Sequence, residues 1–157
     1  MEWNIRHATA EDLEALLGLY HDYHNGLLAV GMNYDLNEQN LPRVLENRVR
    51  SRLILTAVAQ AESGDLVGFV FCSILRLAPE YLCRGESCVG YLNDLYVSPS
   101  ARRQGLAHAL TDYAEAWLRE RDVKVLELQV LEQNTGAWNF WKQQDMKPVG
   151  RICCKYL

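Results

Sequence analysis

The sequence lacks the features typical of membrane, exported and nucleic-acid-binding proteins. No apolar run reaches the roughly 18 residues that a membrane span requires. The N-terminal stretch MEWNIRHATAEDLEALL has no signal-peptide pattern, which predicts a cytoplasmic location away from the membrane. The 16 basic against 20 acidic residues give a net charge of −4, so no general nucleic-acid surface is expected. A cationic substrate suits that balance, although solubility alone explains it equally well.

The cysteines lack a metal-binding or disulfide pattern. There are five, they form no Cys-x-x-Cys pair, and the four histidines do not fall at zinc-finger spacing around them. Cys83 and Cys88 flank a short loop, so a disulfide or a metal site between them is an alternative. A cytoplasmic location favours reduced thiols, and we expect no metal site.

Repeats, low-complexity stretches and linkers are also absent, which predicts one domain over residues 1–157. Hydrophobic periodicity predicts elements in the order β-α-α-β-β-β-α-β-α-β. A capping box at Thr9 and Asp12 opens the first helix, and residues 24–40 are expected to form a loop with a short helix. The other predicted elements are a helix over 41–51, the hairpin RLILTAVAQAESGDLVGFVFCSILRL, the strand CVGYLNDLYVS, a helix over 103–121, the strand VKVLELQVL, the helix NTGAWNFWKQQ and a final strand pair in MKPVGRICCKYL.

Residues 101–110, ARRQGLAHAL, place two arginines and a glycine at the entrance of a predicted helix. A helix N-terminus has unpaired N–H groups and a partial positive charge, so it attracts anions. Arg102 and Arg103 add cationic donors suited to phosphate oxygens, and Gly105 removes a Cβ where a ligand would approach the backbone. The segment predicts a pyrophosphate site; taken alone, a solvated basic helix end is the other interpretation.

The pattern Arg102-x-x-Gly105-x-Ala107, with Asn134 and Phe140 downstream, resembles the GCN5-related N-acetyltransferase (GNAT) superfamily. In that superfamily the motif Gln/Arg-x-x-Gly-x-Gly/Ala binds acetyl-CoA between a strand and a helix. The resemblance covers the element order of almost the whole chain. It implies an α/β (α+β) fold with a mixed, splayed central sheet flanked by helices, and acetyl-CoA as cosubstrate.

The resemblance also implies where acetyl-CoA binds. Strands carrying residues 93–97 and 126–131 would splay apart, and the pantetheine arm would bond to strand backbone in the gap. Asn134 would bond the same arm, although Asn is also a favourable helix N-cap. His108 would reach the phosphates or stay a simple exposed helix residue. The cofactor-binding residues implied are Leu95, Tyr96, Val97, Arg102, Arg103, Gln104, Gly105, Leu106, Ala107, His108, Asn134 and Phe140.

Direct acetyl transfer to an amine needs a proton acceptor, an oxyanion donor and a proton for the leaving thiolate. The backbone N–H of Leu95 or Val97 is the implied oxyanion donor. Many superfamily members use a tyrosine for the thiolate where this chain has Trp141, whose indole N–H donates a hydrogen bond but delivers no proton. Another hydroxyl or water would then protonate the thiolate, or the protein binds CoA without fast turnover. For Trp141 itself, the default interpretation is a packing role.

The proton acceptor departs from the pattern as well. Asn93 stands where diamine and polyamine acetyltransferases have Glu, and Asn cannot act as a base. Asp94 is the candidate, provided that a β-bulge turns it to the same face as Asn93. It would hold an ammonium group or pass a proton to water; a carboxylate that pairs with an arginine is an equally weighted alternative. Glu127 is a weaker second choice.

The acceptor pocket is expected in the loop after the first helix and in the loops at the strand ends. Tyr23, His24 and Tyr34 there, together with Asn93, are the candidate substrate-binding residues, and aromatic rings with a carboxylate suit a cationic amine. The prediction is an N-acetyltransferase for a small primary amine such as a diamine or an amino acid, acting without a covalent intermediate. Alternatives are a protein lysine or N-terminal acetyltransferase, an acyl-CoA-binding sensor and a plain interaction domain. The C-terminal RICCKYL would suit a homodimer.

Overall fold

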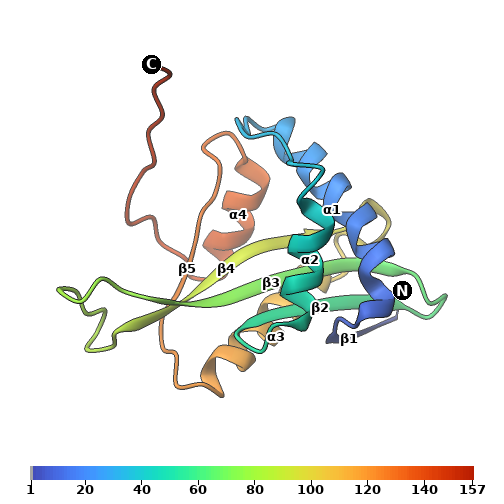
Figure 1. Ribbon diagram of the computed structural model, residues 1–157, viewed down its shortest axis with the longest axis horizontal. Coiled ribbons are helices and arrows are strands. Elements are labelled where there is room, and N and C mark those ends of the chain that lie inside the picture. The colour runs from blue at the N-terminus through green and yellow to red at the C-terminus, as the bar shows by residue number, and fades with distance from the viewer. Residues whose placement is uncertain (1) are drawn as a thin grey trace.

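A five-stranded mixed sheet forms the centre of the computed structural model, which describes residues 2–157 (Figure 1). The strands lie in chain order, β1 to β5. The first four pair antiparallel, and β5 runs parallel to β4. Their bounds are β1 (Trp3–His7), β2 (Ile54–Ala61), β3 (Leu66–Arg76), β4 (Cys88–Val97) and β5 (Leu126–Leu128).

Helices cover both faces of this sheet. In Figure 1, α1 (Leu13–Leu28) and α2 (Leu41–Arg50) cross in front of it, and α3 (Leu106–Arg119) lies behind it. The helix α4 (Thr135–Gln143) lies beside the end of β5, and two short 3₁₀ turns span Ala10–Asp12 and Pro99–Ala101. This is the α+β architecture with a mixed sheet that the sequence predicts.

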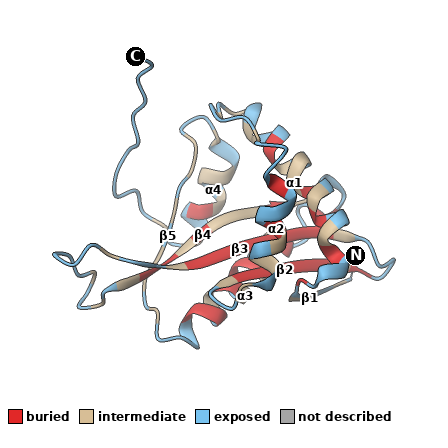
Figure 2. Ribbon diagram, in the orientation of Figure 1, coloured by how far each residue is buried: buried red, intermediate tan, exposed pale blue. Residues whose placement is uncertain are grey.

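The alternation of side chains along β3 explains the two layers. Val70 and Cys72 pack into the core against α3, while Phe69 and Phe71 pack into the core against α1 and α2. All four are fully buried, so the centre of β3 reads as one apolar run rather than an alternating one (Figure 2).

A β-bulge in β4 sets the position of the candidate carboxylate. Phe71 pairs with Asp94 but Cys72 pairs with Leu92, so Asn93 is the extra residue. The hydroxyl of Ser73 donates to Asn93 Oδ1 at 2.8 Å, so Asn93 projects to the side chains on the α1/α2 face. The bulge on which the assignment of Asp94 depends is therefore confirmed, and both side chains share one face.

The parallel strands β4 and β5 separate after a short contact. β5 pairs only with Gly90–Leu92, so the rest of β4 has no partner on that side among the described residues. The Ser98 N–H donates to the Val67 carbonyl at 2.9 Å. This bond shows which residues at the end of β4 direct their backbone groups toward β3. Because bonds alternate along an antiparallel pair, the N–H and C=O groups of Leu95 and Val97 turn away from β3 into the gap. The predicted splay is confirmed.

The predicted C-terminal strand pair is wrong. Residues 144–157 contain no strand, and the chain trails away from the body of the molecule (Figure 1). Its apolar residues suggested a strand, but no described strand lies against them to supply hydrogen bonds. The exposed apolar side chains of this tail are Val149, Ile152, Tyr156 and Leu157.

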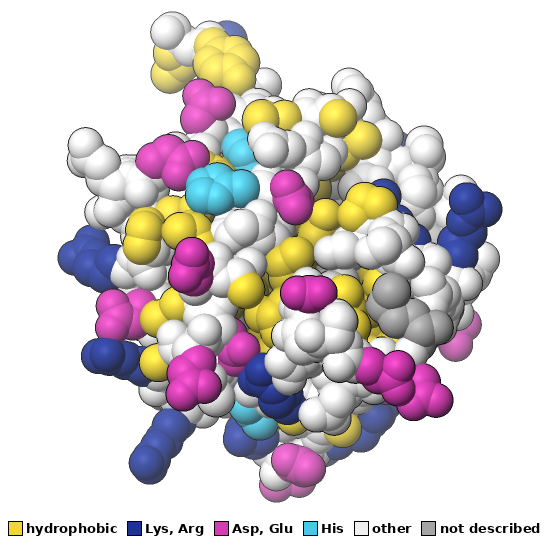
Figure 3. Space-filling model, turned by 90° about the vertical axis from the view of Figure 1, so that its right-hand side faces the viewer, with side chains coloured by type: hydrophobic (Ala, Val, Ile, Leu, Met, Phe, Trp, Pro, Cys, Tyr) yellow, Lys and Arg dark blue, Asp and Glu magenta, His cyan; other side chains and the backbone are white. Residues whose placement is uncertain are grey.

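Smaller differences concern the N-terminal loop and the cysteines. The first helix continues to Leu28, so part of the loop expected over residues 24–40 is helical. All five cysteines are free thiols, and no group of three His, Cys, Asp or Glu side chains in residues 2–157 is arranged to hold a metal. No helix in the same range is long and apolar enough to cross a bilayer. Acidic and basic side chains intermingle on the face in Figure 3.

Candidate active site

The turn between β4 and α3 presents backbone N–H groups to one place. Gly105 is the N-cap of α3 and has a left-handed φ of 85°, and Arg103 has a φ of 58°. The first N–H to bond inside the helix is that of Ala109, which donates to the Gly105 carbonyl at 3.1 Å. The N–H groups of the three residues 106–108 have no intrahelical acceptor and point out of the positive helix end. This geometry suits a phosphate.

The side chains of the same turn divide into anchored and free groups. Arg102 Nε donates to the Val97 carbonyl at 3.0 Å, which folds this side chain back onto the end of β4. Gln104 Nε2 donates to the Ser100 carbonyl at 3.1 Å and fixes the turn itself. Arg103 is exposed and forms no ion pair within residues 2–157. Arg103 is thus the unpaired cation of the predicted pyrophosphate site, and Arg102 is the anchored one.

Helix α4 borders the gap between the splayed strands. Asn134 Oδ1 accepts the Ala137 N–H at 3.1 Å, so the helix-capping role of Asn134 is confirmed. The ring of His108 lies 5.0 Å from that of Phe140, and the amide of Gln144 donates to His108 Nδ1. These contacts join the start of α3 to α4 at the end of the gap. Two of the predicted cofactor residues, His108 and Phe140, are therefore in contact.

Trp141 belongs to the core. Its side chain is only 6% exposed and packs in the cluster that includes α3, with its ring 4.8 Å from that of Phe140. This position favours the packing role over the catalytic one. No hydroxyl stands in place of the tyrosine that the superfamily pattern would put there.

Asp94 is the centre of a polar cluster between the sheet and the two front helices. Arg48 Nη1, on α2, lies 2.9 Å from Asp94 Oδ2 in an ion pair. From α1, the Tyr23 hydroxyl donates to Oδ1 at 3.0 Å and the Tyr20 hydroxyl to Oδ2 at 3.4 Å. The Asp94 side chain is 13% exposed and that of Arg48 is 23% exposed. We call these four residues the Asp94 cluster.

The tyrosines of the cluster remain protonated at neutral pH. Burial, followed by the negative charge of Asp94, raises the pKa of Tyr20 to about 12 and raises the pKa of Tyr23 further. The pKa of the neighbouring Tyr91 is also raised by burial and by the charges of Asp94 and Glu127. The phenols of Tyr20 and Tyr23 therefore act as hydrogen-bond donors to the Asp94 carboxylate.

The predicted substrate residues separate in the structure. Tyr23 belongs to the Asp94 cluster, and Asn93 lies beside it on the bulge. His24 is buried, and its Nε2–H donates to the Tyr34 carbonyl at 2.8 Å, so it fixes the loop. Tyr34 is 67% exposed, and its carbonyl is the acceptor for His24.

The residue that the sequence analysis missed is Arg48. Arg48 comes seven residues after Leu41 and three residues after Leu45, and both leucines are buried. Arg48 therefore lies on the stripe of α2 that faces the core. A cation on that stripe needs a buried partner, and this is the signal that could have identified it.

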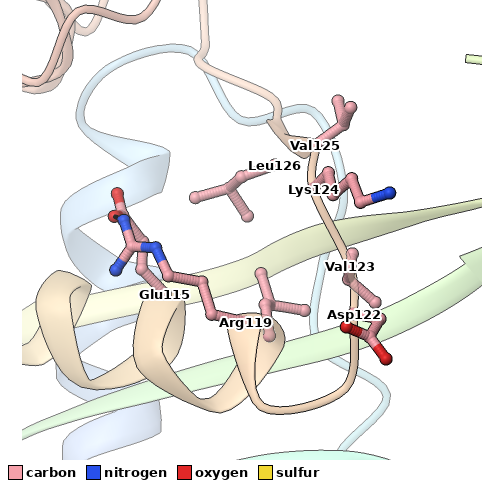
Figure 4. A pocket seen from close by; sticks show the side chains of 8 residues that line it. Glu115, Arg119, Asp122, Val123, Lys124, Val125 and Leu126 are labelled. Carbon is pink, nitrogen blue, oxygen red and sulfur yellow. Dashed lines mark hydrogen bonds and ion pairs between the residues drawn. The ribbon is translucent and has the colours of Figure 1, made fainter. Parts of the chain in front are cut away.

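A separate hollow lies at the opposite end of α3 (Figure 4). It is open to solvent and has none of the predicted site residues in its wall. The residues that line it are Glu115, Leu118, Arg119, Asp122, Val123, Lys124, Val125 and Leu126. It is therefore not part of the candidate active site.

The family is decided by a match over most of the chain. The model described as Acetyltransferase (GNAT) family matches residues 13–146. The chain belongs to the GNAT acetyltransferase family. This GNAT acetyltransferase is 27% identical over 143 residues to an uncharacterized N-acetyltransferase of Archaeoglobus fulgidus, with 91% of this chain and 92% of the relative covered. The superfamily and the enzyme class predicted from the motif are confirmed.

Aminoglycoside acetyltransferases are among the similar proteins. The GNAT acetyltransferase is 36% identical over 85 residues to an aminoglycoside N(6')-acetyltransferase type 1 of Klebsiella aerogenes, covering 54% of this chain and 53% of the relative. The structure of AAC(6')-Iy in complex with the bisubstrate analog CoA-S-monomethyl-acetylneamine has a TM-score of 0.79 at 18% identity, covering 100% of this chain and 99% of that chain. At that identity the likeness shows the fold.

Proposed function

We propose that this enzyme transfers the acetyl group of acetyl-CoA directly to a primary amine of a small molecule. The observation that carries the proposal is the course of β4. Its open edge at Leu95 and Val97 borders the gap, its end leads into the anion-binding turn, and its bulge carries Asp94. The donor site and the acceptor site that we propose would therefore meet on one strand. The CoA-containing complex of AAC(6')-Iy, which has the same fold, supports acetyl-CoA as donor.

The residues present fit the parts of acetyl-CoA. The unpaired N–H groups at the start of α3, with Arg103, suit the pyrophosphate, and Arg102 would hold the end of β4 in place. The Leu95 and Val97 backbone groups suit the amides of the pantetheine arm. When bound, acetyl-CoA supplies a thioester whose carbonyl carbon an amine can attack.

The chain's own groups would then stabilise the transfer. The N–H of Leu95 or Val97 would donate to the carbonyl oxygen as the C–N bond forms and the C–S bond breaks. Both oxygens of Asp94 already accept hydrogen bonds, so we assign Asp94 to holding the ammonium form of the acceptor, with the proton leaving through water. Since Trp141 has no acidic proton to give, water or a phenol such as Tyr91 would protonate the thiolate.

A catalytically weak acyl-CoA-binding protein is the second candidate. The position of Trp141, buried in the core where the superfamily pattern expects a tyrosine, favours it. The two candidates differ in turnover, because a binder would take up acetyl-CoA without releasing free thiol in the presence of any amine. Protein lysine and N-terminal amines belong in the same screen. We also keep a homodimer through the C-terminal tail as a proposal, since that tail exposes apolar side chains.

Thermal unfolding with and without acetyl-CoA tests the donor site. Ligand at about 100 times its dissociation constant adds roughly 2.7 kcal/mol to the free energy of unfolding, which raises the midpoint by several degrees. The double variant Arg102→Ala/Arg103→Ala should show a much smaller shift than wild type. Arg76→Ala/Arg84→Ala, two exposed arginines outside the turn, is the control of equal charge and should behave as wild type. No shift in wild type would refute the donor site.

A further inference from the structure

The Asp94 cluster places a cation and an anion side by side where the proposed acceptor would bind. Arg48 and Asp94 come from α2 and β4, which are joined here by their ion pair. Both side chains keep some exposure, so a ligand can reach them from solvent. The inference developed here rests on the proposed function, because it concerns the acceptor of that reaction.

Arg48 has more hydrogen-bond donors than the protein uses. A guanidinium carries five N–H groups. Within residues 2–157, its hydrogen bond runs from Nη1 to Asp94 Oδ2, and its carbon lies 4.7 Å from the centre of the Phe71 ring. The Phe71 ring contributes a cation–π contact and offers no oxygen or nitrogen acceptor to the N–H groups of Arg48. The edge donors on Nη2 and Nε remain available to an anionic group.

The surroundings do not supply that anion. From α1, the Tyr23 hydroxyl is directed to Asp94, and the Tyr20 hydroxyl donates to Asp94 and also lies within hydrogen-bonding reach of the Arg48 guanidinium, which limits the rise of the Tyr20 pKa. From β3 and the bulge, Ser73 and Asn93 bond to each other. Within residues 2–157, Arg48 forms no ion pair besides the one with Asp94. The free edge of Arg48 therefore has no carboxylate of its own besides Asp94.

We infer that the acceptor is a small zwitterion of the α-amino-acid type, with Asp94 binding its ammonium group and Arg48 its carboxylate. In such a molecule the two charges sit on neighbouring carbons, which matches a carboxylate and a guanidinium 2.9 Å apart. Arg48 keeps Asp94 through Nη1 and binds the ligand carboxylate through the remaining edge, where planar two-point contact is favourable. A diamine would instead bring two positive charges to a carboxylate that is already paired.

Matched amines with and without a carboxylate test this assignment. The probes are L-serine against ethanolamine, L-tyrosine against tyramine and L-histidine against histamine, with release of the CoA thiol as readout. For wild type we expect kcat/KM at least about tenfold higher for the carboxylated member of at least one pair, equivalent to about 1.4 kcal/mol. Arg48→Met should abolish that ratio, mainly through KM, and Arg48→Lys should retain part of it. Because the ratio compares two substrates of one variant, a loss of active protein lowers both kcat/KM values equally and leaves their ratio unchanged.

The control variant is Arg43→Met, on the same helix but exposed, where the one side-chain hydrogen bond within residues 2–157 goes to Asn40. It should keep the wild-type ratio. Equal or better use of the decarboxylated amines, an unchanged ratio in Arg48→Met, or no turnover of any probe while acetyl-CoA still stabilises the protein would each overturn the assignment. Absence of stabilisation by acetyl-CoA would instead overturn the proposed function, and this inference with it.

Discussion

The ion pair between Arg48 and Asp94 should stabilise the fold by tying α2 to β4. We consider Asp94→Ala, Arg48→Met and the double variant. Asp94→Ala leaves a guanidinium and two tyrosine hydroxyls without their acceptor. Breaking a fully buried pair costs about 3–5 kcal/mol and breaking an exposed one about 0–1 kcal/mol. With these two side chains 13% and 23% exposed, we expect about 2–3 kcal/mol.

The two single variants should differ. Arg48→Met leaves Asp94 with its two tyrosine donors, so we expect a cost of about 1–2 kcal/mol, smaller than that of Asp94→Ala. The double variant should cost less than the sum, with a coupling energy of about 1–2 kcal/mol. Urea unfolding followed by circular dichroism measures all four proteins. For a chain of this length, the midpoint of thermal unfolding should fall by roughly 2–4 °C per kcal/mol.

The exposed pair of Glu115 and Arg119, one helical turn apart on α3, is the control cycle. Its coupling should stay at or below about 0.5 kcal/mol. A coupling energy of the same size for Arg48 and Asp94 would refute the reasoning, because it would mean that the buried pair contributes no more than a surface one. So would a larger cost for Arg48→Met than for Asp94→Ala.

Three further predictions concern the fold and the donor site. The Arg6 guanidinium holds the pKa of Asp12 below its usual range. The contribution of this pair to the free energy of unfolding should therefore be fully present above about pH 4 and be lost as the pH drops through the lowered pKa. Urea titrations at several pH values should show a weaker loss of stability in acid for Asp12→Asn. Gly90→Ala would place a Cβ 2.5 Å from Leu118 Cδ1 in the packed α3 face and should cost about 1–3 kcal/mol in the same assay. Gly105→Ala would force a φ of 85° on an L-residue, at about 1–2 kcal/mol, and should weaken stabilisation by acetyl-CoA; unchanged stabilisation would argue against the turn as the phosphate site.

Local features of the sequence predicted most of the fold and the donor site. The turn that we propose to bind phosphate is built from neighbours in the chain, since Arg102, Arg103 and Gly105 directly precede α3. The helices and the paired strands were predictable because hydrophobic periodicity is also a pattern of residues close together in the chain. The C-terminal strand pair failed because alternation is a property of one segment, whereas a strand needs a partner.

The proposed acceptor site was less predictable because it is built from distant segments. Arg48 and Asp94 are 46 positions apart, and no local pattern links them. Tyr20 and Tyr23 are farther still from Asp94 along the chain, at 74 and 71 positions. The sequence could supply the polar candidates, but only the packing of α1 and α2 on the sheet selects which of them meet.

The bulge at Asn93 explains how one strand serves both layers and the site. Before the bulge Leu92 faces α3, and after it Tyr96 faces α1 and α2. The two residues are four positions apart, an even number, which in a regular strand places side chains on the same face. In an unbroken strand these residues would share a face, so either Leu92 would leave the α3 core or Asp94 would enter it as an unpaired charge. One extra residue avoids both outcomes. It directs the carboxylate to Arg48 and the two tyrosines, close to the point where β4 loses its partner β5 and its open edge begins.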